Sequence, residues 1–183
     1  MDLRKATKAL IPIAVIAPLV VIVSWGATEI MVEQTAGKEF CTSCHTMIPM
    51  GVSYEADVHG GANNSGVTAL CIDCHVPHDN PFAYLWGKAV SGTHDVWAEM
   101  TYDLDAIDWQ AKRKHPERFV YDSGCLHCHI NLESATMSDV KAFVAHKPYF
   151  LGKTEQTCAN CHAVGHKNLS KYIVRTGSLG ESK

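Results

Sequence analysis

The sequence contains no cysteine outside four copies of one short pattern. Its eight cysteines form CTSCH, CIDCH, CLHCH and CANCH, which begin at Cys41, Cys71, Cys125 and Cys158. A disulfide framework gives no reason for a histidine after every second cysteine, and structural zinc sites usually have their other ligands about a dozen or more residues away. Cys-x-x-Cys-His is the attachment site of a c-type haem. The pattern therefore predicts four haem c groups, held by Cys41, Cys44, Cys71, Cys74, Cys125, Cys128, Cys158 and Cys161.

The chain also lacks a strong charge of either sign and any sustained alternation of polar and apolar residues. A formal net charge of −3 over 183 residues gives no reason to expect nucleic acid as a partner. Without period-two alternation, long strands are not expected, and GGANNSG (60–66) is typical of a loop. We expect a mainly α-helical fold with much irregular structure, in which each haem motif lies on a short helix. Residues 82–100 and 134–146 are the better candidates for longer helices.

No charged residue lies between Lys8 and Glu29. The uncharged run ALIPIAVIAPLVVIVSWGAT would form a helix roughly 30 Å long, enough to cross the hydrocarbon core of a membrane. A cleaved secretory signal is the alternative, but its apolar region usually spans only about 7–15 residues. Basic residues precede the run, so an uncleaved anchor would keep the amino terminus cytoplasmic and place the haems on the outer side. These residues are Arg4, Lys5 and Lys8.

The spacing of the motifs predicts how the chain is divided. The intervals between their first cysteines are 30, 54 and 33 residues, which indicates two similar two-haem units separated by a longer insert. We therefore expect a transmembrane anchor over residues 1–32, a compact tetrahaem domain over residues 33–168 and a polar tail over residues 169–183.

Histidine and methionine are the candidate ligands for the haem irons. Four of the eleven histidines belong to the motifs, namely His45, His75, His129 and His162. The others are His59, His78, His94, His115, His127, His146 and His166. Three haems with two histidine ligands each would need three of these. Met47 follows His45 by only two residues, so the first haem has two candidate ligands from one short turn. The alternative for Met47 is packing against porphyrin or lipid.

Several motifs together resemble the NapC/NirT family of membrane-anchored tetrahaem quinol dehydrogenases, which includes the NrfH type. They are the amino-terminal anchor, FCTSCHTM, the histidine of ADVHGGANNSG, CIDCHVPH, and the closing CANCH with a histidine shortly after it. The resemblance spans nearly the whole chain. It implies that Met47 ligates the first haem and displaces His45, which would be a ligand only if Met47 is not.

The resemblance also implies which histidines complete the other haems. His59 and His166 match family ligands, and His146 matches a histidine of the NapC-like members that the NrfH type lacks. Family geometry would give His166 to the second haem, His146 to the third and His59 to the fourth. The remaining four spare histidines are expected to lie at the surface or to pack against neighbours.

Lys88 and Asp95 are the candidate quinol-binding residues. They are seven residues apart, so a helix would place both on one face. Four aromatic residues of the kind found at the headgroup level surround them in the sequence, namely Phe82, Tyr84, Trp86 and Trp97. From the residues alone, an exposed ion pair on an interfacial helix explains the pattern better. The resemblance reverses this preference, because it implies that Lys88 hydrogen-bonds a quinol oxygen and that Asp95 accepts protons beside the first haem.

The function implied by the resemblance is oxidation of menaquinol or ubiquinol and transfer of electrons to a periplasmic terminal reductase during anaerobic respiration. The protein would be an enzyme, a quinol dehydrogenase, in the bacterial inner membrane with its haem domain in the periplasm. Its reductase partner would act on nitrite, nitrate or a similar acceptor, and homo-oligomerisation is left open. The alternative is a tethered electron carrier without a quinol site of its own. A terminal reductase is a third and weaker reading.

Overall fold

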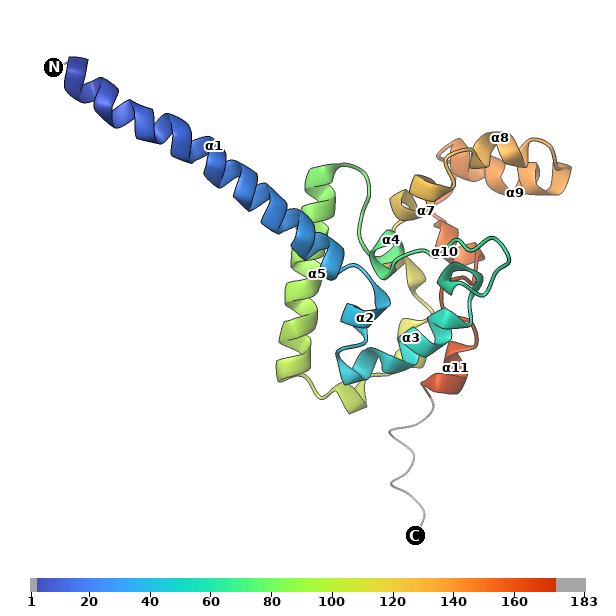
Figure 1. Ribbon diagram of the computed structural model, residues 1–183. Coiled ribbons are helices and arrows are strands. Elements are labelled where there is room, and N and C mark those ends of the chain that lie inside the picture. The colour runs from blue at the N-terminus through green and yellow to red at the C-terminus, as the bar shows by residue number, and fades with distance from the viewer. Residues whose placement is uncertain (1–2, 174–183) are drawn as a thin grey trace, which may run out of the picture.

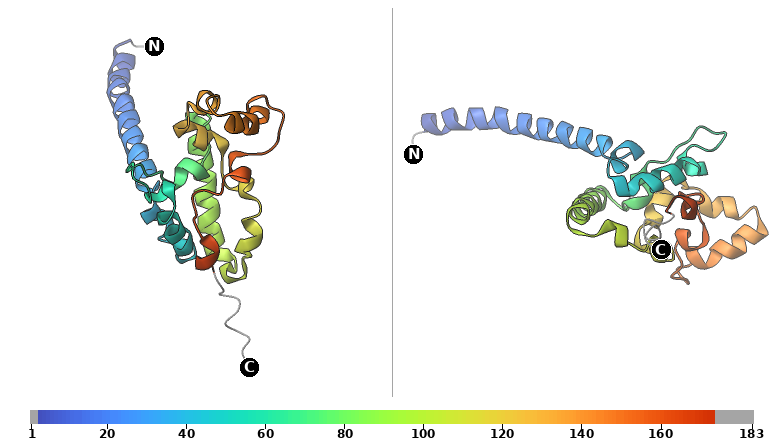
Figure 2. Two further views of the ribbon diagram at one scale, coloured as in Figure 1. Left: turned by 90° about the vertical axis from the view of Figure 1, so that its right-hand side faces the viewer. Right: turned by 90° about the horizontal axis from the view of Figure 1, so that it is seen from below.

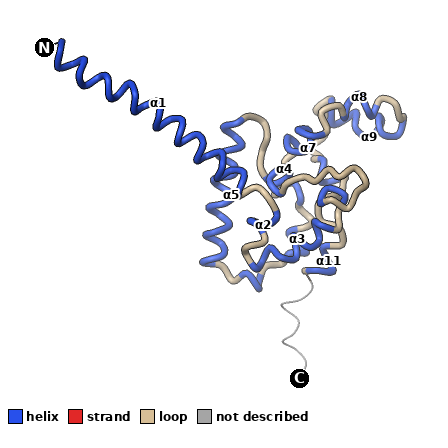
Figure 3. The backbone as a smooth tube through the Cα atoms, viewed as in Figure 1, coloured by secondary structure: helices blue, strands red, loops and turns tan. Residues whose placement is uncertain are grey.

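The computed structural model describes residues 3–173, and every regular element in that range is a helix (Figure 3). This confirms the mainly α-helical prediction. The α-helices are α1 (Leu3–Gln34), α2 (Lys38–Cys41), α3 (Ile48–Glu55), α4 (Cys71–His75), α5 (Pro81–Thr101), α6 (Trp109–Lys112), α7 (Asp122–Cys128), α8 (Leu132–Thr136), α9 (Val140–Phe150), α10 (Cys158–Cys161) and α11 (Leu169–Tyr172). Short 3-10 helices are η1 (His45–Met47), η2 (Val58–Gly60), η3 (Leu104–Ala106) and η4 (Pro116–Arg118).

Helix α1 projects from the rest of the molecule, which gathers around its carboxyl end (Figure 1). Within the described residues it is the helix that is long and apolar enough to cross a membrane, with a mean hydropathy of 2.0 and no buried residue over Pro12–Gln34. Two prolines lie inside it, which membrane helices tolerate. The helix continues to Gln34, so it includes the start of the predicted polar link.

Helix α5 is the second longest element, and it corresponds to the predicted helix over residues 82–100. The Asn80 side chain accepts a hydrogen bond from the backbone N–H of Ala83, and Pro81 occupies the first helical turn, where its missing N–H costs nothing. The predicted helix over residues 134–146 is instead two helices, α8 and α9. Asp139 lies between them and caps α9 by accepting from the N–H of Ala142.

Protein side chains form only a small apolar core. The buried apolar residues in the described part of the chain are Ala36, Met50, Val76 and Leu169. Leu169 lies on α11, which packs against α3, so packed structure extends into the stretch expected as a tail. Residues 174–183, the remainder of that expected tail, lie outside the described residues. A small core is expected when a short chain encloses large porphyrins.

Candidate haem-binding and quinol-binding sites

Three of the four cysteine pairs lie on short helices, and all eight thiols are free of disulfide bonds. The second, third and fourth motifs lie on α4, α7 and α10, as predicted. The first differs, because α2 ends at Cys41 and Cys44 lies in the following turn. The hydroxyl of Thr42 donates to the carbonyl oxygen of Lys38 at 2.8 Å, a local bond that competes with continuation of the helix.

Neighbouring motifs contact one another in chain order. The first motif lies next to the second, because the Cys71 thiol is the largest influence on the pKa of the Cys41 thiol. Helix α4 packs on α7, and the backbone N–H of Tyr121 donates to the carbonyl of Cys74 at 3.0 Å. The fourth motif joins the third, since the N–H of Cys158 donates to Asp122 at 2.9 Å. The haem attachment points therefore form one continuous series from first to fourth.

Four pairs of histidine rings lie close together, and one of them, His78 and His127 with ring centroids 5.1 Å apart, contains no motif histidine. The other three pairs face each other across short gaps. The ring centroids are 6.1 Å apart for His75 and His166, 6.3 Å for His59 and His129, and 5.9 Å for His146 and His162. Each pair joins one motif histidine to one of the spare histidines singled out in the sequence. Imidazole nitrogens lie about 2.0–2.1 Å from a bound metal such as zinc, so two rings on opposite sides of one ion have centres roughly 6 Å apart. The spacing fits an iron held between each pair.

Hydrogen bonds orient several of these rings. The Nδ1 atoms of His75, His146 and His166 donate to the backbone carbonyl oxygens of Phe119, Ala142 and Met50 at 2.8, 2.8 and 3.1 Å. A carbonyl oxygen only accepts, so each Nδ1 carries the proton and each Nε2 has a free lone pair. This is the usual arrangement of a histidine that ligates a metal. Burial lowers the pKa of both His75 and His166, which favours the neutral form that binds metal.

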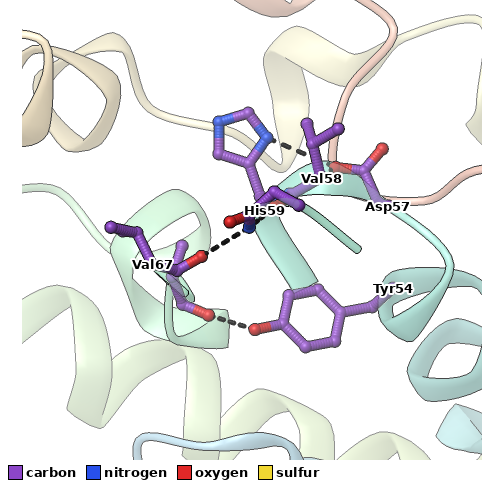
Figure 4. A network of polar contacts seen from close by, with 7 residues as sticks. Tyr54, Asp57, Val58, His59 and Val67 are labelled. Carbon is purple, nitrogen blue, oxygen red and sulfur yellow. Dashed lines mark hydrogen bonds and ion pairs between the residues drawn. The ribbon is translucent and has the colours of Figure 1, made fainter. Parts of the chain in front are cut away.

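His59 is held differently, by a carboxylate. Asp57 accepts from the backbone N–H of His59 at 2.9 Å and lies 3.3 Å from its Nδ1 (Figure 4). The neighbouring Tyr54 donates its hydroxyl proton to the carbonyl of Ala69, which fastens the loop after η2 to α3 (Figure 4). Only 5% of Asp57 is exposed. Sequence reasoning overlooked Asp57, although an aspartate two residues before a candidate ligand is a common local capping pattern.

The ring contacts differ from the expected pairing for two haems. His166 faces the histidine of the second motif, as the resemblance implies. His59, however, faces the third motif rather than the fourth, and His146 faces the fourth rather than the third. The reason lies in the connection after α9, which brings the chain back so that His146 stacks on His162 at an interplanar angle of 17°. That leaves His59 in contact with His129.

The first motif lies against α5 and has no such ring pair among the described contacts. His45 is exposed and Met47 is half-buried, both within η1. Between them, the Thr46 hydroxyl donates to the carboxylate of Glu99 on α5 at 2.8 Å. The turn that carries both candidate ligands of the first haem is therefore bonded to α5.

The charges of Lys88 and Asp95 both influence the pKa of the Cys41 thiol in this motif. The positive charge of Lys88 lowers the pKa of the Cys41 thiol and the negative charge of Asp95 raises it, although the Cys71 thiol is the largest influence and brings the pKa to about 7. The ammonium of Lys88 donates to the carbonyl of Thr35 at 2.9 Å, just beyond α1. Asp95 is exposed, 3.5 Å from Nδ1 of His94. The predicted pair thus lies beside the first haem attachment.

The aromatic residues of α5 divide into two groups. Phe82 and Trp86 stack with centroids 6.4 Å apart and are exposed, as is Trp97. Tyr84 instead lies against His78, with ring centroids 5.2 Å apart, and is half-buried. Tyr84 therefore lies apart from the exposed aromatic residues, and His78 packs against Tyr84 and His127.

A sequence model described as the NapC/NirT cytochrome c family, N-terminal region, matches residues 3–171. The denitrification system component NirT of Stutzerimonas stutzeri is 32% identical over 151 residues, which cover 77% of this chain and 73% of NirT. The tetraheme c-type cytochrome CymA of Shewanella oneidensis is 28% identical over 170 residues, which cover 86% of this chain and 89% of CymA.

A solved structure is also similar. It is a chain from the crystal structure of the cytochrome c nitrite reductase NrfHA complex bound to the HQNO inhibitor. The superposition covers 91% of this chain and 95% of that chain, with a TM-score of 0.52 and 26% sequence identity.

Proposed function

Because the chain belongs to the NapC/NirT cytochrome c family, we propose that it oxidises a membrane quinol and delivers the electrons to a periplasmic reductase. It is a multihaem electron-transfer cytochrome with covalently bound haem c. The observation that carries the quinol proposal is the position of Lys88 and Asp95 on one helix, α5. The charges of both residues influence the pKa of the Cys41 thiol. That helix is joined through Lys88 to the residues just beyond α1.

Helix α1 is proposed as an uncleaved anchor, with the amino terminus in the cytoplasm. The basic residues before the apolar run favour this orientation. The membrane end of the molecule would then include the amino-terminal half of α5, where the exposed Phe82 and Trp86 suit the headgroup level. A lipid-soluble quinol would reach Lys88 by moving laterally in the membrane. We keep residues 1–32, 33–168 and 169–183 as the proposed anchor, haem domain and tail.

The eight motif cysteines would hold four haems through thioether bonds, and each haem iron carries one electron at a time. The three facing ring pairs are the proposed axial ligands of the second, third and fourth haems. Met47 is the proposed ligand of the first. It is half-buried, whereas His45 is exposed. A thioether ligand raises the reduction potential relative to imidazole, which suits a haem that receives electrons from quinol.

At the quinol site, the chain would supply a donor and a proton acceptor. Burial lowers the pKa of Lys88, so part of its affinity for a proton is already lost in the folded protein. Its ammonium would donate a hydrogen bond to one quinol oxygen, in place of its bond to the carbonyl of Thr35. Asp95 is exposed and free to take up the protons that quinol releases. Both side chains would lie close to the first haem motif.

The destination of the electrons is proposed from the relatives. NirT is named as a denitrification component, and the similar solved chain comes from a complex with a nitrite reductase. We therefore propose a periplasmic reductase of a nitrogen oxide or a comparable anaerobic acceptor as partner. His146 supplies the fourth motif with a ligand from this chain itself, so the protein is proposed to bind its haems without borrowing a ligand.

The test is reduction by a quinol analogue. Purified full-length protein in detergent is mixed with menadiol, and haem reduction is followed at its absorption bands with and without HQNO. We expect rapid reduction that HQNO slows, and slow reduction in the Lys88→Met and Asp95→Asn variants. If the parent protein is not reduced, the chain is a tethered carrier. Full-speed reduction in both variants would place the quinol elsewhere.

A further inference from the structure

A concentrated positive patch lies on the segment that follows α5. Residues 112–118 read KRKHPER, and we call them the basic segment. Its cationic side chains are all exposed. They are Lys112, Arg113, Lys114 and Arg118, together with the titratable His115. In a chain whose formal net charge is −3, such a local excess is a distinct electrostatic feature.

Little in the described part of the chain neutralises these charges. The one carboxylate inside the basic segment, Glu117, is already bonded to His115 at 3.1 Å and to the side-chain amide of Asn160 at 3.0 Å. Arg113 donates to Gln110, a neutral group. Among the described residues, no carboxylate lies within ion-pair distance of the four lysine and arginine side chains. Their field therefore extends into the solvent.

The basic segment touches the last haem motif of the series. Helix η4, which carries Glu117 and Arg118, packs on α10, the helix of Cys158 and Cys161. Lys112, His115 and Arg118 also line a cavity of about 180 Å³ together with Phe119. Phe119 also accepts a hydrogen bond from His75 of the second motif, so the cavity borders the second haem site. Helix η4 lies beside the fourth motif, at the end of the relay opposite the quinol site.

The position of the basic segment separates it from the membrane end of the molecule. In Figures 1 and 2 the yellow segment that follows α5 lies on the far side of α5 from the free end of α1. An anionic membrane surface beside α1 would therefore not be its partner. A soluble protein approaching from the aqueous side would meet it.

We propose that the basic segment is the docking surface for a soluble electron acceptor that carries an acidic surface around its redox centre. Exposed charges near a redox centre steer an oppositely charged partner and raise its association rate. The fourth haem attachment then lies under the docked partner. The inference rests on the outward electron transfer of the proposed function, but it does not depend on the quinol site.

The experiment measures electron transfer out of the chemically reduced, full-length protein in detergent. Oxidised plastocyanin serves as an acidic acceptor and mitochondrial cytochrome c as a basic one, each mixed by stopped flow at low and high salt. In the double variant Lys114→Gln/Arg118→Gln we expect the rate to plastocyanin to fall about tenfold at low salt, and the difference to vanish at high salt. The rate to cytochrome c should not fall.

The matched control removes two exposed lysines elsewhere. Lys141→Gln/Lys153→Gln changes the net charge equally at exposed positions outside the basic segment, and we expect less than about a twofold fall. If the rate to plastocyanin falls equally in both double variants, net charge alone explains the effect, and the docking site is overturned. A fall explained by shifted haem midpoint potentials would also overturn it, since the cations would then serve the haem carboxylates. Since reduction is chemical, failure of the quinol site leaves these outcomes unaffected.

Discussion

Replacing Lys88 with methionine is the sharpest test of how this chain would bind a quinol. The ammonium is half-buried and donates to the carbonyl of Thr35 at 2.9 Å, beside the first haem motif. Methionine has a similar length and fills the same space, but it offers neither charge nor donor. The substitution therefore removes one interaction with the quinol oxygen while keeping the packing of α5.

The expected loss follows from the strength of a charged hydrogen bond. Bonds to charged groups contribute about 1.5–3 kcal/mol, and each 1.4 kcal/mol corresponds to about tenfold. We therefore expect kcat/KM for menadiol to fall roughly 10–150-fold. Burial lowers the pKa of Lys88, so the parent protein should lose activity at alkaline pH as the lysine loses its proton. That alkaline limb should be missing in the variant, whose donor is already absent.

The assay is stopped-flow haem reduction over a range of menadiol concentrations and pH. Lys141→Met, on an exposed lysine of α9, is the matched control and should behave as the parent protein. Reduction by dithionite should be equally complete in all three proteins, because the haems are intact. A loss below about threefold, or an unchanged alkaline limb, would refute the role assigned to Lys88.

Three further predictions concern the haem sites. Met47→Leu should abolish the near-infrared charge-transfer band of methionine-ligated ferric haem and lower the potential of one haem, as spectroelectrochemical titration would show. Asp57→Asn should raise the potential of the haem bound at His59 and weaken its ligation about tenfold, because a carboxylate partner makes the imidazole more basic; the same titration measures it. Gly124→Ala should prevent accumulation of folded protein, since its Cβ would lie 1.9 Å from a backbone oxygen of α4, while Gly92→Ala meets nothing within 4 Å and should be tolerated; yield and thermal unfolding of the haem-loaded protein decide.

Each of these predictions has a result that contradicts it. Persistence of the methionine band in Met47→Leu would return ligation of the first haem to His45 or another residue. A potential that stays fixed or falls in Asp57→Asn would mean that the carboxylate only caps η2. A Gly124→Ala protein as stable as the parent would show that α4 and α7 separate easily, and the contact between their haem motifs would lose its support.

The sequence predicted what depends on local pattern. The four motifs, the apolar anchor and the span of α5 follow from spacing, hydropathy and capping residues, which neighbouring positions determine. The ring pairs are different. His59 and His129 are far apart in the chain, and their contact depends on how η2 and α7 are brought together. No local pattern distinguishes His59 from His146 as the partner of a given motif, which is why the ring contacts of those two differ from the family-based pairing.

The break between α8 and α9 illustrates a second limit. Residues 134–146 have the composition of one helix, and Asp139 has a weak helix propensity that a longer pattern can override. Its carboxylate instead accepts from the backbone of Ala142, which starts a new helix there. Capping and mid-helix positions are both available to an aspartate, and only the folded chain shows which one it takes.

The hydrogen-bond partners of the candidate histidine ligands differ from one haem site to the next. His75, His146 and His166 donate to neutral carbonyl groups, whereas Nδ1 of His59 faces the carboxylate of Asp57. A negative partner makes the imidazole a stronger donor to iron, which stabilises the oxidised metal. The third haem site should therefore have a lower potential than the second and fourth. An electron would cross that site as an uphill step, and the positive charge of Arg118, on the helix η4 that packs on α10, would favour arrival at the fourth.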